Sequence, residues 1–460
     1  MLKATLLLSG AALAASLVFG GGTRHGTLSD VVPELLALPL LVVAGPGGLR
    51  ALGREPLLAC LFAAVIALFV LQLIPLPPFI WSVLPGRDTV AQFYTVAGMP
   101  LPWQPLSLSP GETWRAGLAL LPALALLLAT LTLSLAERQV LLGVAVAIGL
   151  ISVPLGILQI LGGGESELYF FQYTNVGSAV GFFANANHYA AFFYMLIPLS
   201  AALLSELPAR RKTVPPLAIL AGVVFAFLLG LALSRSRSAL LLGVLSLFAT
   251  FALILRDPLR RALTRRMRWV VGIVSLAAVL PIVAAMGLLA IIGRFEVQQL
   301  TTEARWTMAG VTWRALLSYF PIGSGLGTFE RVYQLHEPPQ AVRWEVVNHA
   351  HNDWLELTLE TGLLGPVLVI AFFVWCGRAW VRSLASADSF DRSVGVAAGI
   401  AIALISLHSL WEYPLRTIAL STLFGLCCAL LIESPEPMTS RVRGRSQKQD
   451  SRSLGAPIRA

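Results

Sequence analysis

The sequence predicts an all-α, polytopic membrane protein of about 12 transmembrane helices with a long loop on the outer side of the membrane. The first observation is composition: 57% of the 460 residues are hydrophobic and only 12% are charged, whereas soluble domains carry roughly 25% charged residues. The second is the mean hydropathy of +0.77. A chain with so few polar residues cannot cover a water-soluble core, which excludes a soluble globular enzyme and a disordered chain.

The third observation is a series of apolar runs, each approaching the length of about 20 residues that a helix needs to cross the hydrocarbon layer. Segment 29–45 is the weakest, because it contains two acidic residues and two prolines. Segment 2–20 is similar to a signal peptide, but the many spans that follow favour a first transmembrane helix. The expected spans are 2–20, 29–45, 56–76, 115–135, 139–161, 187–205, 215–233, 239–255, 269–292, 354–377, 394–410 and 417–433.

The positive residues predict the orientation of these spans. With the N-terminus in the cytoplasm, 22 of the 33 Lys and Arg residues fall on the cytoplasmic side and 11 on the outer side, in agreement with the positive-inside rule. Both termini are therefore expected in the cytoplasm, with 434–460 as a disordered basic tail. Topology accounts for the net charge of +9, so no nucleic-acid partner is expected.

The expected organisation has four parts. Residues 1–292 hold transmembrane helices 1–9 with a Pro-rich outer loop at 77–114, residues 293–353 form the large outer loop, residues 354–433 hold helices 10–12, and residues 434–460 are the tail. Apolar residues recur every three or four positions within 301–320, which predicts a helix. We expect it either on the outer membrane surface or in a small soluble subdomain. Its stripe comprises Trp306, Ala309, Gly310, Trp313, Leu317 and Phe320.

The cysteines predict neither a disulfide framework nor a zinc site, because all four lie in apolar runs without CxxC spacing. His349, His351 and His336 offer a metal site as an alternative to other roles, but no third ligand is spaced convincingly. No metal is therefore expected. We expect the cysteines to pack as small apolar residues; they are Cys60, Cys376, Cys427 and Cys428.

Arginines on the outer side oppose the orientation signal, so another requirement must keep them there. Arg235 and Arg237 stand in the turn 234–238, between two apolar runs. A guanidinium group recognises phosphate oxygens through paired N–H donors, so this turn is expected to contact a lipid-linked diphosphate, and Arg305 in the large loop is expected to join it. The alternative is structural: a snorkelling turn in which Arg237 caps a helix end, and an Arg305 that pairs with Glu303.

A histidine pair precedes the tenth expected span. Asp353 and Glu356 have the spacing of a capping box, and Glu360 shares their helical face by its i, i+7 spacing. His349 and His351 therefore stand just before a helix at the membrane edge. Imidazole is the natural general base for an acceptor hydroxyl at neutral pH, and a purely structural role is the alternative.

Three further islands interrupt the apolar pattern. Residues 408–416 form a short outer turn that ends in Arg416, and the glycine-rich stretch 321–328 either offers backbone N–H groups to an anion or is a plain turn. The stretch lacks the Gly-Lys-Ser/Thr end of a P-loop. Residues 181–189 place polar groups beside aromatic rings, where they bind sugar hydroxyls or cap a helix; these groups are Asn185, Asn187 and His188.

Together these islands resemble the bacterial O-antigen ligase and O-antigen polymerase superfamily of membrane glycosyltransferases, over about residues 150–430. Residues 181–187 are similar to the family's Gly-x-x-x-Asn-x-Asn pattern, and residues 236–238 to its Ser-Arg-Gly/Ser turn. The family's Arg and Trp followed by Pro-x-x-Gly-x-Gly-x-x-Phe match Arg305, Trp313 and 321–329. Its His-Asn-x-x-Leu and Glu-x-Gly-x-x-Gly patterns match His351, Asn352, Leu355, Glu360, Gly362 and Gly365.

The resemblance implies a GT-C-like enzyme of the bacterial inner membrane. It would transfer a glycan from undecaprenyl diphosphate to a glycan or lipid A-core acceptor on the periplasmic side, with inversion and without a metal or other cofactor. The family register favours His351 as base, with Arg237 and Arg305 holding the diphosphate. The other expected substrate contacts are Arg235, His349, Asn352, Glu360, Asn185, Asn187, His188 and Arg416.

Several functions stay open from the sequence. The family includes ligases onto lipid A core, polymerases of repeat units and protein O-oligosaccharyltransferases, which share these motifs. A non-enzymatic transporter or flippase of lipid-linked glycans is also multi-spanning, but it would place polar residues near the midplane of its spans. The ionisable residues of this sequence gather outside the spans, which favours chemistry at the outer face.

Overall fold

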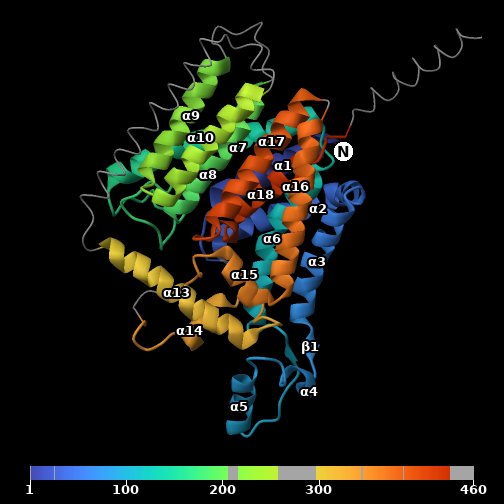
Figure 1. The fold of residues 1–460 in the computed structure, drawn as a ribbon, viewed down its shortest axis with the longest axis vertical. Coiled ribbons are helices and arrows are strands. Elements are labelled where there is room, and N and C mark those ends of the chain that lie inside the picture. The colour runs from blue at the N-terminus through green and yellow to red at the C-terminus, as the bar shows by residue number, and fades with distance from the viewer. Residues whose placement is uncertain are drawn as a thin grey trace, which may run out of the picture.

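The computed structural model is a bundle of helices with a smaller helical layer at one end (Figure 1). It describes residues 2–435 apart from residue 25 and segments 206–215, 257–296, 343–345 and 387. The expected basic tail thus lies almost wholly outside the described residues. Among those that are described, the only strands are the two-residue β1 (Pro75–Leu76) and β2 (Gln104–Pro105). The all-α class predicted from composition is confirmed.

Eleven of the twelve expected spans have a helix, and the remaining one, 269–292, lies outside the described residues. Within the described residues, seven helices are long and apolar enough to cross a membrane: α2 (Leu28–Leu52), α3 (Pro56–Leu73), α6 (Pro110–Thr130), α7 (Leu135–Gly162), α8 (Ala186–Ser205), α16 (Leu364–Ala385) and α17 (Ser389–His408). Four shorter apolar helices complete the set: α1 (Leu2–Phe19), α9 (Pro216–Leu233), α10 (Arg237–Arg256) and α18 (Ile418–Leu430).

The weakest expected span is one of the longest helices. Helix α2 runs through three prolines, and its N-terminus is closed by a capping box in which the backbone N–H of Thr27 donates to Asp30. The acidic residue that weakened the hydropathy signal is thus a cap. A bundle tolerates prolines inside a membrane helix because neighbouring groups satisfy the freed carbonyls.

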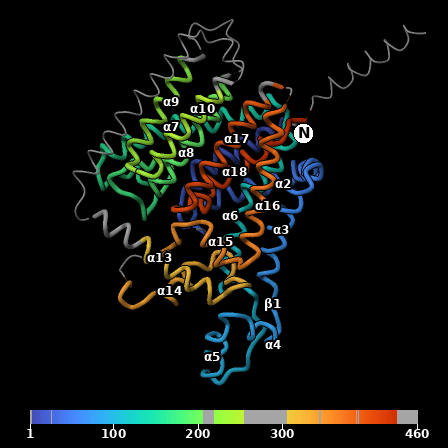
Figure 2. The backbone as a smooth tube through the Cα atoms, viewed as in Figure 1, coloured from blue at the N-terminus to red at the C-terminus, as the bar shows by residue number. Residues whose placement is uncertain are grey.

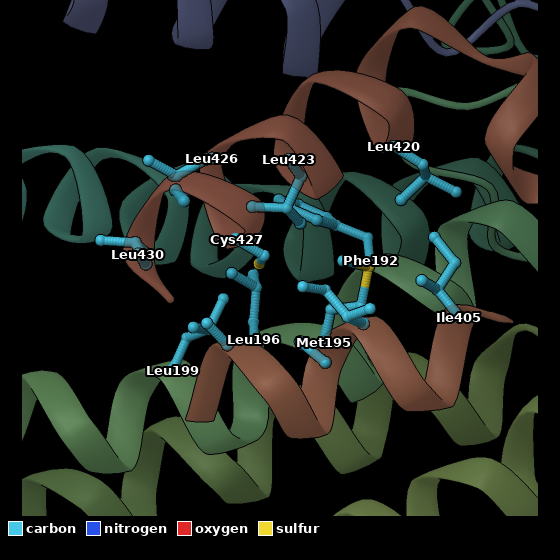
Figure 3. Close-up of a cluster of buried hydrophobic side chains, with 14 of the residues drawn as sticks. Phe192, Met195, Leu196, Leu199, Ile405, Leu420, Leu423, Leu426, Cys427 and Leu430 are labelled. Carbon is cyan, nitrogen blue, oxygen red and sulfur yellow. The ribbon is translucent and has the colours of Figure 1, made fainter. Parts of the chain in front are cut away.

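The core of the bundle forms where α8 crosses α17 and α18. Four α8 side chains, Phe192, Met195, Leu196 and Leu199, face α18 and Ile405 of α17 in Figure 3. Cys427 lies in this cluster as a small apolar side chain, and all four cysteines are free. In the most apolar stretch of α8, 83% of the residues are buried, whereas the corresponding shares in α3 and α16 are only 17% and 22%. These two helices therefore form an edge of the bundle.

We call the end of the bundle that carries residues 74–110 and 297–363 the loop end; it lies at the bottom of Figure 1. The Pro-rich stretch forms a lobe in which β1 pairs antiparallel with β2, with the short helices α4 (Pro78–Trp81) and α5 (Asp88–Val96) between them. The lobe projects farthest from the bundle in Figures 1 and 2. The buried Arg87 fixes it by donating to the carbonyls of Leu106 and Gly323.

The predicted helix of the large loop exists as α13 (Val297–Tyr319) and packs on α14 (Phe329–His336) and α15 (Asp353–Thr361). A second core, separate from that of the bundle, joins these helices through residues such as Val311 and Ala315, as the subdomain alternative requires. The predicted stripe lies on the other face, where the side chains of Trp306 and Trp313 are 75% and 53% exposed. Contact of this face with a membrane surface stays a prediction.

The expected span 354–377 is wrong at its start. Helix α15 ends at Thr361, and Gly362 turns the chain with φ +60, so the apolar helix α16 begins only at Leu364. A side chain at position 362 would collide with the carbonyl oxygen of Pro321, which explains the glycine. The acidic face predicted on this segment therefore lies on a separate nine-residue helix at the loop end.

One local expectation is corrected at this end, and one open alternative is decided. The N-cap of α15 is Asn352, whose side chain accepts from Leu355 N, and not Asp353. In the glycine-rich stretch, the N–H groups of residues 324–326 donate to Leu359 O, Glu360 O and Gln72 Oε1. Since these donors already have protein acceptors, the stretch is a structural turn that docks α15 on the bundle.

Candidate functional site

A buried carboxylate collects polar groups from four elements at the loop end. Glu412, in the turn after α17, accepts hydrogen bonds at Oε1 from Arg305 Nη2 (2.7 Å) and Asn187 Nδ2 (2.6 Å), and its Oε2 lies 3.3 Å from His351 Nδ1. Burial alone raises the pKa of a carboxyl, but His351 and Arg305 outweigh it and lower the pKa of Glu412 to about 2. We call these four residues the base cluster.

His351 is held in an unusual backbone conformation. Its φ is +49, in the left-handed region that non-glycine residues seldom adopt and that is enriched at functional sites. Its Nδ1 faces the Glu412 carboxylate, so the Nδ1–H donates and Nε2 keeps a free lone pair. Within the described part of the chain, Nε2 has no hydrogen-bond partner, and the side chain is 25% exposed.

His349 is bound at both ring nitrogens. Nδ1 lies 2.8 Å from Glu356 Oε1, and Nε2 lies 3.0 Å from the carbonyl oxygen of Thr23. Both partners are acceptors, so the fully bonded form is the imidazolium. Burial lowers the pKa of His349, but the carboxylate of Glu356 and the Thr23 carbonyl raise it above the ordinary value. Without a free nitrogen, His349 is poorly placed to accept a proton from a substrate.

The predicted acidic face of α15 converges on Arg416. Its Nη1 lies 2.7 Å from Glu360 Oε2 and 3.5 Å from Glu356 Oε1, and its Nε lies 3.5 Å from Asp353 Oδ1. Burial raises the pKa of Asp353 to about 6, although Arg416 opposes the shift. These four residues and His349 form what we call the brace cluster. Its charges face one another and hold α15 against the turn before α18.

The three arginines expected at the diphosphate, Arg235, Arg237 and Arg305, do not have the partners that the structural alternative predicts. Arg305 pairs with Glu412 rather than with Glu303, and its side chain remains 43% exposed. Arg235 (φ +57) and Arg237 are both exposed, with no hydrogen bond or ion pair to any described residue. The cap of α10 is Ser236, whose Oγ accepts from Ala239 N, so Arg237 does not cap this helix. All three guanidinium groups therefore retain free donors.

The N-terminus of α10 lies next to the base cluster. Ser238 Oγ is 3.3 Å from His408 Nε2, and the carbonyl oxygen of His408 accepts from the N–H of Glu412. Tyr194 Oη contacts the other ring nitrogen of His408 at 3.0 Å. The residue after Arg237 thus contacts His408, whose carbonyl oxygen accepts from the N–H of Glu412, the partner of Arg305. Convergence of Arg237 and Arg305 on one diphosphate stays a prediction.

The ring of Tyr413 lies close to the rings of three histidines. Its ring lies 4.4 Å from the ring centre of His349, 5.0 Å from that of His351 and 4.8 Å from that of His188. His188 is fully buried, with neither ring nitrogen bonded to a described residue. Asn185 accepts from Asn187 N through its side chain and reaches Tyr413 Oη at 3.5 Å. The expected sugar-binding groups are thus mostly inside the protein.

The structure adds two candidate site residues that sequence reasoning missed, Glu412 and Tyr413. Both lie in the polar turn 408–416, and the available signal was an acidic residue in a short outer turn. Asn352, an expected substrate contact, caps α15 and donates to Leu410 O at 2.9 Å. Among the described residues, no three His, Cys, Asp or Glu side chains are grouped to hold a metal ion, and His336 Nδ1 bonds to Val332 O.

The fold and the site define a polytopic membrane protein with a histidine–carboxylate–arginine cluster at one end of its bundle. Residues 221–370 match the family model described as O-antigen ligase. Over this range, the match confirms the resemblance to the O-antigen ligase and polymerase superfamily that the motifs indicate. The matched range contains Arg237, Arg305 and His351 but ends before Glu412. A search of curated proteins finds no match.

Proposed function

We propose that this protein transfers an oligo- or polysaccharide from undecaprenyl diphosphate to an acceptor on the periplasmic face, as an O-antigen ligase or a polymerase of a surface polysaccharide. The observation that carries the proposal is the contact of Glu412 with both His351 and Arg305. It brings a general base and a phosphate-binding side chain to one carboxylate. O-antigen ligase-type activity in general is supported by the family match.

In the proposed reaction, His351 is the general base. Glu412 accepts from Nδ1–H and fixes the tautomer, so Nε2 takes the proton of the acceptor hydroxyl. The acceptor oxygen forms a bond to the anomeric carbon while the bond from that carbon to the diphosphate oxygen breaks. The polyprenyl diphosphate leaves with the electron pair, and direct displacement inverts the anomeric carbon.

Arg237 and Arg305 are proposed to bind the diphosphate. Negative charge grows on the leaving phosphate in the transition state, and preorganised donors in a site of low dielectric stabilise it. Arg305 uses one nitrogen on Glu412 and is 43% exposed, so other donors of its planar fork remain for phosphate oxygens. No cofactor is required by this route, because the histidine and arginines supply proton transfer and charge stabilisation.

Two alternatives have different consequences. A protein O-oligosaccharyltransferase uses the same donor and site with a protein acceptor. A lipid-linked glycan flippase places its polar residues near the midplane of the spans, whereas the base cluster and brace cluster of this chain lie at the loop end. This location favours chemistry at the membrane surface over transport.

Deletion of the gene followed by analysis of surface glycans tests the proposal. A ligase deletion leaves lipid A core without long chains, a polymerase deletion leaves single repeats, and loss of a protein-directed enzyme leaves unglycosylated protein. Complementation with His351→Asn should restore none of these products at wild-type protein level. Full restoration by this variant would contradict the proposed base.

The proposed orientation has its own test. The charge distribution predicts residue 340 in the periplasm and both termini in the cytoplasm. Alkaline phosphatase and green fluorescent protein fusions near 340 and after 440 report these sides. Cytoplasmic behaviour near 340 would contradict the orientation and the periplasmic reaction together.

A further inference from the structure

A cavity of about 380 Å³ lies along the edge of the bundle, and neither Arg237 nor Arg305 lines it. It is lined by α3, α6, α16 and α18, which stand side by side in Figure 1, and by the start of α15. Its volume falls in the range of small-molecule sites, roughly 300–1,000 Å³. Along α3 it extends from Leu58 to Leu68, about 15 Å at the rise of a helix. The cavity is thus elongated along the direction of the spans.

The lining of the cavity matches a hydrocarbon chain with a polar head, because it is apolar along its length and charged only at the loop end. Only two lining residues are charged, Asp353 and Arg416, and they face each other at the loop end. The rest of the lining is almost entirely apolar, with Phe62, Leu120 and Phe424 among it. The cavity lies along α3 and α16, the two least buried of the long apolar helices in the described residues.

The loop end of the cavity is next to the base cluster. Asp353 follows His351 by two residues, and Arg416 follows Glu412 by four. The lining includes no residue of α8, α10 or α13, so neither Arg237 nor Arg305 lines this cavity. The three carboxylates of the brace cluster outnumber its two cations, which disfavours a diphosphate at this mouth.

We propose that this cavity holds a hydrocarbon chain of a lipid-anchored acceptor, so that the acceptor glycan reaches His351 from the side opposite the donor. The proposal rests on the proposed function, because it assigns the donor diphosphate to Arg237 and Arg305. It selects an acceptor that is embedded in the membrane, as in ligation or polymerisation on lipid carriers, over a protein acceptor.

The test fills the cavity with a larger side chain. Ala119 of α6 and Ser421 of α18 line it from two helices, and Ala119→Phe and Ser421→Phe fill it independently. Ala63→Phe is the matched control, since Ala63 is an exposed residue of α3 that does not line the cavity. Two filling variants on different helices separate loss of the cavity from misfolding of one variant.

Transfer is measured with purified protein in vesicles, using the acceptor that accumulates in the deletion strain, intact or stripped of its hydrocarbon chains. We expect each filling variant to lower the ratio of kcat/KM for the intact over the stripped acceptor at least tenfold. The stripped acceptor and the donor KM should be unaffected, and Ala63→Phe should behave as wild type.

The outcomes are distinct. Wild-type protein that transfers to neither acceptor contradicts the proposed function itself. Wild-type transfer with an unchanged ratio in both filling variants overturns the acceptor cavity alone, and so does an acceptor that carries no hydrocarbon chain. A rise in donor KM instead assigns the cavity to the donor's polyprenyl chain and also overturns the proposal. If both filling variants are folded like wild type and lose the same factor in kcat/KM on the intact and the stripped acceptor, the proposal is also overturned.

Discussion

The base cluster and the brace cluster each contain a histidine, a glutamate and an arginine, but they differ in which histidine nitrogen is left without a partner. Each pairs a histidine Nδ1 with a glutamate, at 3.3 Å for His351 and 2.8 Å for His349. His349 is enclosed and its Nε2 is bound to Thr23, whereas His351 keeps Nε2 unbonded and is 25% exposed. A histidine serves as base only where one nitrogen remains available, so of these two histidines only His351 has the geometry of the proposed base.

The largest effect should come from removing the base. His351→Asn retains a residue that tolerates the left-handed backbone but cannot accept the proton, so we expect transfer to fall about 10²–10⁴-fold. Thermal unfolding of the purified variant should match wild type, which excludes a folding defect. The paired variant His349→Gln should keep more activity per folded molecule. If the ranking is reversed, the roles given to the two histidines are exchanged.

The glutamates sharpen the comparison. Glu412→Gln should lower kcat by about 10²-fold, because a neutral amide no longer favours the charged form of His351 during proton transfer. Glu356→Gln should instead lower the free energy of unfolding by about 1–3 kcal/mol, since it weakens buried bonds to His349 and Arg416. Kinetics and thermal unfolding of both variants separate these effects. Equal kcat losses would show that the clusters do not differ in function.

The arginines test whether the base cluster also binds phosphate. Arg237→Lys and Arg305→Lys should each reduce transfer about tenfold or more, because lysine cannot donate through a planar fork. Arg331→Lys is the control at an exposed position of the same loop end, where the pair with Glu112 is long at 3.7 Å. Activity and donor binding are measured at equal expression. Wild-type values in both test variants would remove the diphosphate role.

The smallest effect is a pH dependence of stability in the brace cluster. The pKa of His349 is raised in the folded protein, so its contribution is complete below the unfolded value near 6.5 and is lost as the pH rises through the folded value. The melting temperature should therefore drop more between pH 6 and 9 in wild type than in His349→Gln. Parallel curves would contradict the imidazolium assigned to His349.

The sequence by itself determined the membrane class, eleven helix positions and the identity of the histidine and arginine motifs. Hydropathy and charge are local, additive properties, and the bilayer imposes one length on every span, so they can be read without the fold. The Gly-x-Gly and His-Asn motifs could also be recognised, because each consists of residues that are neighbours in the sequence. The orientation of the spans, which was inferred from the distribution of Lys and Arg, stays a prediction.

Only the tertiary structure decided which polar residues act together. Glu412 lies 61 positions after His351 and 107 after Arg305, so no spacing rule connects them. Arg416, an expected substrate contact, forms ion pairs with the acidic face of α15, and Asn352 rather than Asp353 caps that helix. Buried charges require partners, and the choice of partner depends on how distant helices pack, which one-dimensional patterns do not contain.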